Sequence, residues 1–248
     1  MARGWHRLRF LLRERNGRGL ASFMAADPFA MNRWTAKVFR HRQVSSTAYE
    51  LTLSRDGLQF RAGQLITIHG RDITEDRNYS IASGENDDAL TVLYRLIPDG
   101  VLTPRLVRLA EGDSIDVSGP YGEFVIRDLG RPLVFVATGT GIAPCRAYAR
   151  THPGLDLTIL HGVRRVEDLF FRSELEAYHY FPCVSGESSP WFRGRVTEFA
   201  RSFNFPPDAD FYLCGANEMF YEMREILTER GISPHAIFTE AYYYTHDA

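Results

Sequence analysis

Two segments in the first half of the chain carry residues that could hold phosphate groups. Arg77-Asn78-Tyr79-Ser80 brings a cation, an aromatic ring and a hydroxyl together between two segments of strand character. Gly100-Val101-Leu102-Thr103 places small residues and a hydroxyl where a short helix would begin. Amides at a helix start bind anions, and an arginine can bind two phosphate oxygens at once. Together these residues predict a pyrophosphate site.

Two further segments predict a ligand site in the second half of the chain. Gly139-Thr140-Gly141-Ile142-Ala143-Pro144 follows an apolar run and begins a helix, so its glycines would let an anion approach the backbone. It is not a G-x-G-x-x-G fingerprint, because Pro144 stands at the last glycine position. Cys214-Gly215 ends another apolar run, and open α/β sheets bind ligands at the carboxyl ends of their strands.

The elements that must position these residues divide the chain into two domains. Residues 34–129 alternate with period two and are divided by turn signals, which indicates a closed antiparallel β-barrel. Residues 130–248 contain unbroken apolar runs separated by helical patterns, which indicates an α/β domain with a parallel sheet.

The individual elements follow from the same patterns. The predicted barrel strands are Thr35–Val44, Ala48–Ser54, Gln64–His69, Asn78–Ala82, Ala89–Leu96 and Ser114–Val117, with one helix at Leu102–Arg108. The predicted sheet strands are Leu133–Ala137, Leu157–Leu160 and Phe211–Leu213, and the predicted helices are Ala143–Arg150, Val166–Tyr178 and Met219–Arg230.

Composition excludes several classes of protein. The 248 residues carry a net charge of −2, which argues against nucleic-acid binding, and no apolar run is long enough for an integral membrane segment. Cys145, Cys183 and Cys214 form no CxxC pair and the histidines show no metal-ligand spacing, so we expect no metal and treat the histidines as structural. Unpaired cysteines favour a cytoplasmic location.

The first 33 residues form a basic extension that we expect to be poorly ordered. They are rich in arginine and have only a short apolar run, too short for the core of a signal peptide. A segment that contacts anionic membranes and an organelle transit peptide are the alternatives.

The four motifs, in this order and spacing over residues 34–248, resemble the ferredoxin–NADP reductase family (ferredoxin- or flavodoxin-dependent). The resemblance implies an FAD-binding barrel followed by an NAD(P)-binding α/β domain. Arg77 would bind the FAD pyrophosphate, Tyr79 would pack on the flavin, and Ser80 would bond near flavin N5. Gly100 and Thr103 would complete the phosphate site.

The resemblance also implies roles in the second domain. Gly139, Thr140, Gly141, Pro144 and Gly215 would hold the nicotinamide nucleotide. Cys214 would lie beside the nicotinamide C4 atom with Glu240 nearby, although a structural thiol and a surface carboxylate are the alternative interpretations. Tyr242, two residues after Glu240, would cover the flavin as a movable aromatic lid.

Arginines near the second site favour NADP(H) as the nucleotide. Arg164 and Arg195 are candidates for the 2′-phosphate, because arginine suits phosphate recognition. Gly186 stands where NADP-specific bacterial relatives tend to carry arginine, so NAD(H) is not excluded.

We therefore predict an FAD-dependent ferredoxin (or flavodoxin)–NADP⁺ reductase. It would exchange hydride between NADPH and flavin N5 and pass single electrons to a separate carrier protein, since no C-x₄-C-x₂-C run is present. Carrier docking would use barrel arginines: Arg40, Arg42, Arg61, Arg71, Arg105 and Arg108. The alternatives are an NAD(P)H-dependent reductase component of a multi-component oxygenase, a free-flavin reductase, and a non-catalytic flavin-binding redox sensor. No heptad pattern requires a dimer.

Overall fold

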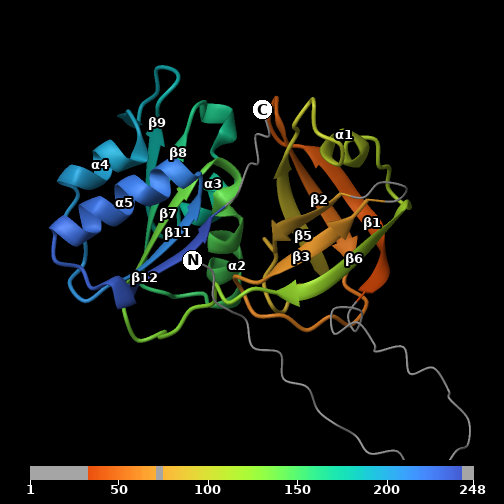
Figure 1. The fold of residues 1–248 in the computed structure, drawn as a ribbon, viewed down its shortest axis with the longest axis horizontal. Coiled ribbons are helices and arrows are strands. Elements are labelled where there is room, and N and C mark those ends of the chain that lie inside the picture. Colours follow the sequence, from red (N-terminus) through yellow and green to blue (C-terminus); the bar gives the residue numbers. More distant parts are fainter. Residues whose placement is uncertain (1–32, 71–74, 242–248) are drawn as a thin grey trace, which may run out of the picture. The chain divides into compact units, whose positions relative to one another are not determined.

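The computed structural model describes residues 33–70 and 75–241, which form two six-stranded sheets (Figure 1). The strands of the first sheet are β1 (Arg33–Gln43), β2 (Ala48–Ser54), β3 (Leu65–His69), β4 (Asp76–Ser80), β5 (Ala89–Arg95) and β6 (Ser114–Tyr121). Residues 1–32 of the expected basic extension and the expected lid residue Tyr242 lie outside the described ranges, whereas Arg33, the last residue of that extension, begins β1.

The first sheet is an antiparallel barrel, as the sequence predicts. Its strands follow the order β4-β3-β6-β1-β2-β5. The two edge strands β4 and β5 meet just beyond Ser80, where Ile81 bridges to Val92 and the Ala82 amide donates to the Thr91 carbonyl at 2.7 Å. Closure therefore fixes the end of β4, which carries the Arg77-x-Tyr79-Ser80 motif.

The second sheet is parallel throughout and has the order β10-β9-β8-β7-β11-β12. Its strands are β7 (Leu133–Thr138), β8 (Leu157–Val163), β9 (His179–Val184), β10 (Phe192–Arg193), β11 (Asp210–Gly215) and β12 (Ile237–Ala241). The chain crosses from one side of β7 to the other when it enters β11, so β7 and β11 flank the switch point at which such sheets bind ligands.

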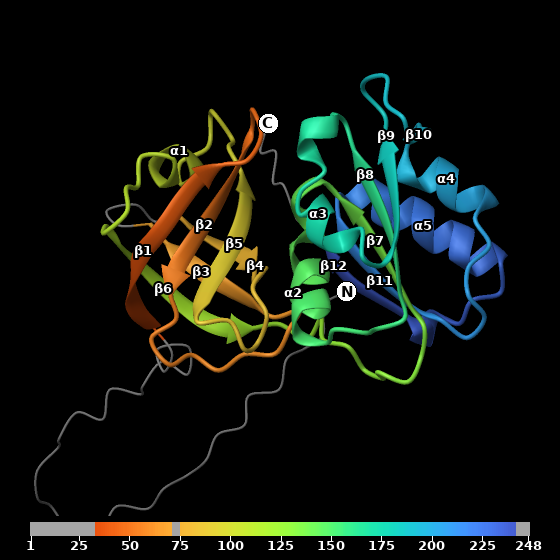
Figure 2. The ribbon, with the colours of Figure 1, turned by 180° about the vertical axis from the view of Figure 1, so that it is seen from behind.

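Helices cover both faces of this sheet (Figure 2). They are α2 (Ala143–Thr151), α3 (Arg172–Leu175), α4 (Val196–Ser202) and α5 (Asn217–Glu229), with 3₁₀ turns η2 (Gly139–Ile142), η3 (Val166–Asp168) and η4 (Pro234–Ala236). In β7, Phe135 and Ala137 pack with α2, whereas Val134 and Val136 pack with α4 and α5. The unbroken apolar run of β7 thus follows from burial on both faces.

One hydrophobic core joins the barrel to the α/β domain. Ala62, Ala82 and Phe124 from the barrel side pack with Ala147 and Tyr148 of α2 in a single buried cluster. The Tyr148 hydroxyl donates to the Phe124 carbonyl, and the described residues from Arg33 onward belong to one compact unit. This shared core holds the two sheets together and so positions the site that lies at their ends.

An ion pair and two hydrogen bonds reinforce this contact. Arg150 of α2 donates to both carboxylate oxygens of Asp87, in the loop before β5, at 2.7 and 3.0 Å. At another point Ser46, in the turn between β1 and β2, donates from its amide and its hydroxyl to Glu167 of η3.

The prediction of one helix over Val166–Tyr178 is wrong. The segment contains η3 and the single-turn helix α3, and Phe171 between them adopts a left-handed conformation at φ 58°. The physical reason lies in two neighbouring side chains: Leu169 is buried against Val163, whereas Phe170 is buried in the core shared with the barrel. The helix predicted over Leu102–Arg108 is also shorter, because α1 spans only Thr103–Leu106.

None of the helices in the described ranges has both the length and the apolar character needed to cross a membrane.

Candidate active site

Three predicted catalytic residues meet in a cluster in which Ser80 and Cys214 are buried and Glu240 is half-buried. Ser80 ends β4, Cys214 lies near the end of β11, and Glu240 lies opposite Cys214 in the neighbouring strand β12. The Ser80 hydroxyl donates to Glu240 Oε2 at 2.6 Å, and Cys214 Sγ lies 3.9 Å from the same oxygen. Strand ends from both domains therefore build this cluster, which the sequence placed together only through the family resemblance.

Burial controls the charge of the cluster. Burial raises the pKa of the Glu240 carboxyl above its ordinary value, while the hydrogen bonds from Ser80 and Cys214 oppose the rise. Ser80 is 4% exposed and Cys214 is 1% exposed. A carboxyl group with a raised pKa beside a hydroxyl and a thiol can hold or release a proton within hydrogen-bonding reach of a reacting atom.

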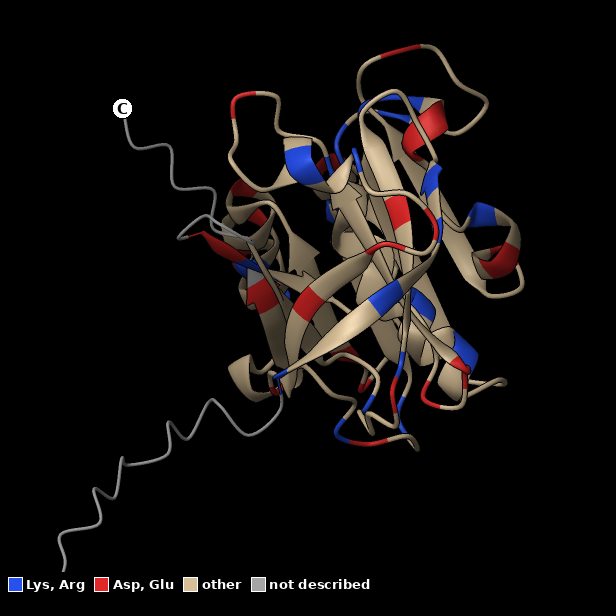
Figure 3. Cartoon of the chain, turned by 90° about the vertical axis from the view of Figure 1, so that its right-hand side faces the viewer, with Lys and Arg blue, Asp and Glu red and all other residues tan. Residues whose placement is uncertain are grey.

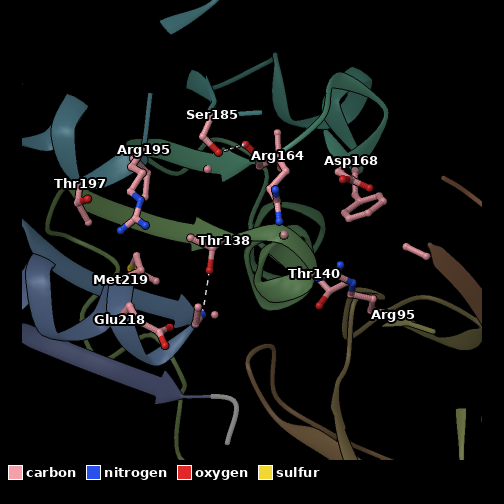
Figure 4. A pocket seen from close by; sticks show the side chains of 18 of the residues that line it. Arg95, Thr138, Thr140, Arg164, Asp168, Ser185, Arg195, Thr197, Glu218 and Met219 are labelled. Carbon is pink, nitrogen blue, oxygen red and sulfur yellow. Dashed lines mark hydrogen bonds between the residues drawn. The ribbon is translucent and has the colours of Figure 1, made fainter. Parts of the chain in front are cut away.

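A cleft of about 530 Å³ opens at the carboxyl ends of the parallel strands (Figure 4). Five of the predicted cofactor-binding residues line it: Gly139, Thr140, Arg164, Arg195 and Gly215. The size falls within the range of ligand pockets in proteins, and the position is the switch point of the sheet. Gly215, which lines the cleft, follows Cys214 of the cluster directly in β11.

The glycines around the cleft serve two different purposes. Gly139 has φ +53°, and a Cβ atom built there would meet no atom within 4 Å, so the space over this residue is open to a ligand. A Cβ on Gly141 would lie 2.4 Å from the Cys214 carbonyl oxygen, and one on Gly215 would lie 2.2 Å from Thr138 Oγ1. Gly141 and Gly215 thus allow the loop to pack against β11. Pro144 is buried in the first turn of α2 and does not line the cleft.

Cations face the cleft from both domains. Arg164 follows β8, Arg195 precedes α4, and Arg95 ends the barrel strand β5 (Figure 4). Arg195 Nη1 lies 3.3 Å from Glu222 Oε1 in an exposed ion pair. Arg165, beside Arg164, contacts Glu167 and the Ser46 hydroxyl instead. Three carboxylates, those of Asp168, Glu218 and Glu222, line the same cleft, so an anionic ligand would meet positive charge locally, at the arginines.

The predicted residues of the barrel lie on two segments. Arg77 is exposed and forms an ion pair with Glu75 at 2.9 Å. The Tyr79 ring meets Tyr94 edge to face, with 6.2 Å between the ring centroids. Thr103 Oγ1 accepts from the Ile97 amide at 2.9 Å and donates to the Ile97 carbonyl, so this hydroxyl closes the loop before α1.

The loop before α1 also contains Gly100, whose amide donates to the same carbonyl at 3.0 Å. Its turn is tight, because a Cβ atom on Gly100 would lie 3.1 Å from the Ile97 carbonyl oxygen. The backbone of this loop is therefore fixed by internal hydrogen bonds.

Three residues that belong to the site were not identified in the sequence analysis. Thr138 Oγ1 accepts from the Ala216 amide at 2.9 Å and so joins the two loops that line the cleft. Arg95 contributes a cation from the barrel, and His161 binds the Gly139 carbonyl from beneath. Thr138 and His161 could have been identified from the sequence, because they lie next to recognised motifs. No sequence pattern points to Arg95.

Two family patterns match the two domains in turn. The pattern described as an oxidoreductase FAD-binding domain matches residues 35–126, and that of an oxidoreductase NAD-binding domain matches residues 135–225. The fold and the site therefore define a flavoprotein oxidoreductase with binding domains for FAD and NAD(P).

Known proteins identify the family within this class. The chain is 32% identical over 240 residues to a ferredoxin–NADP reductase of Pseudomonas aeruginosa, covering 81% of this chain and 91% of that protein. It is 29% identical over 229 residues to the toluate 1,2-dioxygenase electron transfer component of Pseudomonas putida, covering 84% of this chain and 67% of that protein. The chain belongs to the ferredoxin–NADP reductase family and is an FAD- and NAD(P)-dependent oxidoreductase of that type.

A solved structure supports the fold. The ferredoxin–NADP⁺ reductase of Neisseria gonorrhoeae, solved with FAD and NADP bound, matches with a TM-score of 0.77 at 22% identity, covering 86% of this chain and 99% of that one.

Proposed function

We propose that this chain is an FAD-dependent reductase that takes electrons from NADPH and passes them singly to a separate ferredoxin or flavodoxin. The observation that carries the proposal is that the Ser80–Cys214–Glu240 cluster and the lining of the cleft include consecutive residues of β11. Cys214 belongs to the cluster and Gly215 lines the cleft. A nucleotide in the cleft would thus bring its reactive ring to the strand ends that carry the cluster. For the domains we propose the boundaries 34–129 and 130–248.

The residues of β4 suit an FAD site on the barrel. Along β4 the side chains pass from exposed Arg77 to buried Ser80, which suits a cofactor with a solvated phosphate end and a sheltered ring. Arg77, with Gly100 and Thr103, would hold the pyrophosphate, and Tyr79 would pack on the ring. When bound, FAD supplies the exchange between two-electron chemistry at nicotinamide and one-electron chemistry at a carrier.

The cluster would orient and shelter the reacting atoms. Ser80 and Cys214 are both nearly inaccessible to water, so water would be excluded from the strand ends at which the two rings would stack. Glu240 would accept from Ser80 and so fix the orientation of its hydroxyl. Tyr242, which lies outside the described residues, remains our proposed lid.

For the nucleotide we propose NADP(H), bound with Arg164 and Arg195 at the 2′-phosphate and with Gly141 and Pro144 shaping the loop. A second candidate, an NADH-dependent oxygenase reductase component, has one observation in its favour. A Cβ on Gly186 would lie 2.6 Å from the Arg164 carbonyl oxygen, so this loop does not admit the arginine of NADP-specific relatives without a shift of the backbone.

In this proposal the carrier protein docks on the barrel. Arg40, Arg61, Arg105 and Arg108 are exposed, Arg42 pairs with Glu50, and Arg71 lies outside the described residues. Basic and acidic segments are interspersed on this side of the molecule (Figure 3). We therefore expect a local contact with an acidic carrier rather than long-range steering. The three free, buried cysteines support a reducing cytoplasm.

The test is anaerobic titration of the FAD-loaded protein with NADPH and, separately, with NADH, while the flavin absorbance is followed. Fast bleaching by NADPH, followed by reoxidation on addition of ferredoxin or flavodoxin, supports the proposal. Replacing Arg164 with alanine should then reduce the preference for NADPH over NADH about ten-fold. Arg165→Ala should leave the preference unchanged, because the Arg165 side chain contacts Glu167 and Ser46 instead. Fast bleaching by NADH alone favours the oxygenase component, and no bleaching by either nucleotide favours a flavin-binding sensor.

A further inference from the structure

His161 lies in β8 beneath the loop that begins with Gly139 and is fully buried. Its Nδ1 atom is 2.8 Å from the Tyr180 hydroxyl, and its Nε2 atom is 3.0 Å from the Gly139 carbonyl oxygen. A carbonyl can only accept a hydrogen bond, so Nε2 must carry the hydrogen. In the neutral ring Nδ1 is then an acceptor, and the Tyr180 hydroxyl donates to it.

The neutral ring is the form that burial favours. Burial lowers the pKa of His161 to about 4, despite the opposing hydrogen bond to the Gly139 carbonyl. Near neutral pH the two hydrogen bonds therefore keep the same direction: Tyr180 donates to His161, and His161 donates to the Gly139 carbonyl.

These two hydrogen bonds set the orientation of the peptide group between Gly139 and Thr140. A trans peptide is planar, and its C=O and N–H groups point in opposite directions. His161 holds the Gly139 carbonyl toward the interior. The Thr140 amide must then point the other way, toward the cleft that Gly139 and Thr140 both line.

We propose that Tyr180 and His161 form a positioning pair that aims the Thr140 amide at the diphosphate of a bound dinucleotide. The inference rests on the proposed function, because it needs a dinucleotide in the cleft. The diphosphate is common to NADPH and NADH, so the pair contributes to the binding of both. This separates its effect from that of Arg164, which we place at the 2′-phosphate.

A purely structural role for His161 predicts a different outcome. If the ring only filled space, an apolar side chain of similar size would serve as well. In the positioning role, an apolar side chain leaves the Gly139 carbonyl without its buried partner, and the Gly139–Thr140 peptide is free to rotate toward another acceptor. Glutamine keeps an N–H donor close to the position of Nε2 and should rescue binding.

The test measures the dissociation constants of NADP⁺ and NAD⁺ on the FAD-loaded full chain by calorimetry, together with the melting temperature. His161→Leu should raise both constants about ten-fold, which corresponds to roughly one hydrogen bond. His161→Gln should stay within about three-fold of the wild type, and Tyr180→Phe should raise both constants about three-fold. Tyr148→Phe, which removes a buried hydroxyl outside the cleft, should lower the melting temperature and leave both constants unchanged.

Several results would overturn the positioning pair. One is wild-type affinity in His161→Leu, and another is an equal loss in His161→Gln, which would leave only a packing role. A loss confined to NADP⁺ would place the effect at the 2′-phosphate instead. If His161→Leu does not fold, unchanged constants in Tyr180→Phe overturn the pair. A wild-type protein that binds neither nucleotide refutes the proposed function as well, whereas normal wild-type binding with unaffected variants refutes the pair alone.

Discussion

Replacing Ser80 with alanine should raise the pKa of Glu240. The Ser80 hydroxyl donates to Glu240 Oε2 at 2.6 Å, which is the length of a hydrogen bond to an ionised carboxylate. Burial already raises this pKa, and the hydrogen bonds from Ser80 and Cys214 are what oppose the rise. Without the Ser80 donor the charged form loses a stabilising contact, while the burial is unchanged.

The size of the shift follows from that contact. A hydrogen bond to a charged group contributes about 1.5–3 kcal/mol, and one pKa unit corresponds to about 1.4 kcal/mol. Cys214 Sγ stays at 3.9 Å, too far to compensate fully. We therefore expect an upward shift of about one to two units.

The sign for stability follows from linkage. Between the unfolded and the folded pKa of Glu240, the folded protein holds a proton on this carboxyl that the unfolded chain releases, because the pKa is higher in the folded state. The contribution of this group to stability is therefore fully present below the unfolded pKa. It is lost as pH rises through the folded pKa, and Ser80→Ala should extend this window to higher pH.

The assay is a pH titration of the glutamate carboxyl carbons by ¹³C NMR, with the Glu240 resonance assigned from its loss in Glu240→Gln. Ser83→Ala is the matched control, because Ser83 is also a buried serine of the barrel and its hydroxyl accepts from the Thr91 amide instead. A midpoint in Ser80→Ala that is equal to or below that of the wild type would refute the reasoning.

Two further predictions concern the domain contact and the cleft. Burial alone would raise the pKa of Asp87, but the hydrogen bond from Arg150 contributes to a net decrease. The contribution of ionised Asp87 to the stability of the folded protein is therefore present above the unfolded pKa of about 4, and it is lost as pH falls through the folded pKa. Asp87→Asn should lower the unfolding free energy by ~1 kcal/mol at neutral pH in urea titrations, whereas exposed Asp88→Asn should not, and the difference should vanish in strong acid. Gly139→Ala should weaken binding of both nicotinamide nucleotides, because it places a side chain over the cleft at φ +53°. Gly154→Ala, strained at φ +98° away from the cleft, should reduce stability without changing affinity; an equal loss of affinity in both variants would contradict this account.

The spacing of apolar residues and the unbroken apolar runs were sufficient to predict the two sheets from the sequence. They were not sufficient to predict every strand. Strand β9 (His179–Val184) escaped prediction because Pro182 interrupts its apolar character. The structure tolerates this proline because β10 pairs with β9 only from Cys183 onward, which leaves β9 as an edge strand at Pro182. Helix α4 also escaped prediction, since its 7 residues, about two turns, are too few for a clear helical period.

The cluster at the site illustrates a different limit of sequence reasoning. Ser80 and Glu240 are 160 positions apart, and neither has a local pattern that points to the other. Their contact depends on barrel closure after β4, on the core shared through α2, and on the register of β11 with β12. Only the family resemblance suggested it. Conversely, His161 lies shortly before Arg164, which the sequence analysis singled out. Its hydrogen-bond partners, Gly139 and Tyr180, become evident only when β7, β8 and β9 are placed side by side.

The state of the arginines in the cleft and on β4 suggests how a dinucleotide would be recognised. Arg77 and Arg195 already form ion pairs with Glu75 and Glu222, and the paired side chains are 35–66% exposed. Exposed pairs of this kind contribute about 0–1 kcal/mol, so exchanging a carboxylate for a phosphate changes the free energy little. The Thr140 amide differs, because its peptide is held from the interior before any ligand arrives. Affinity should therefore come mainly from the fixed backbone of the loop, while the exposed arginines decide between ligands that differ in charge.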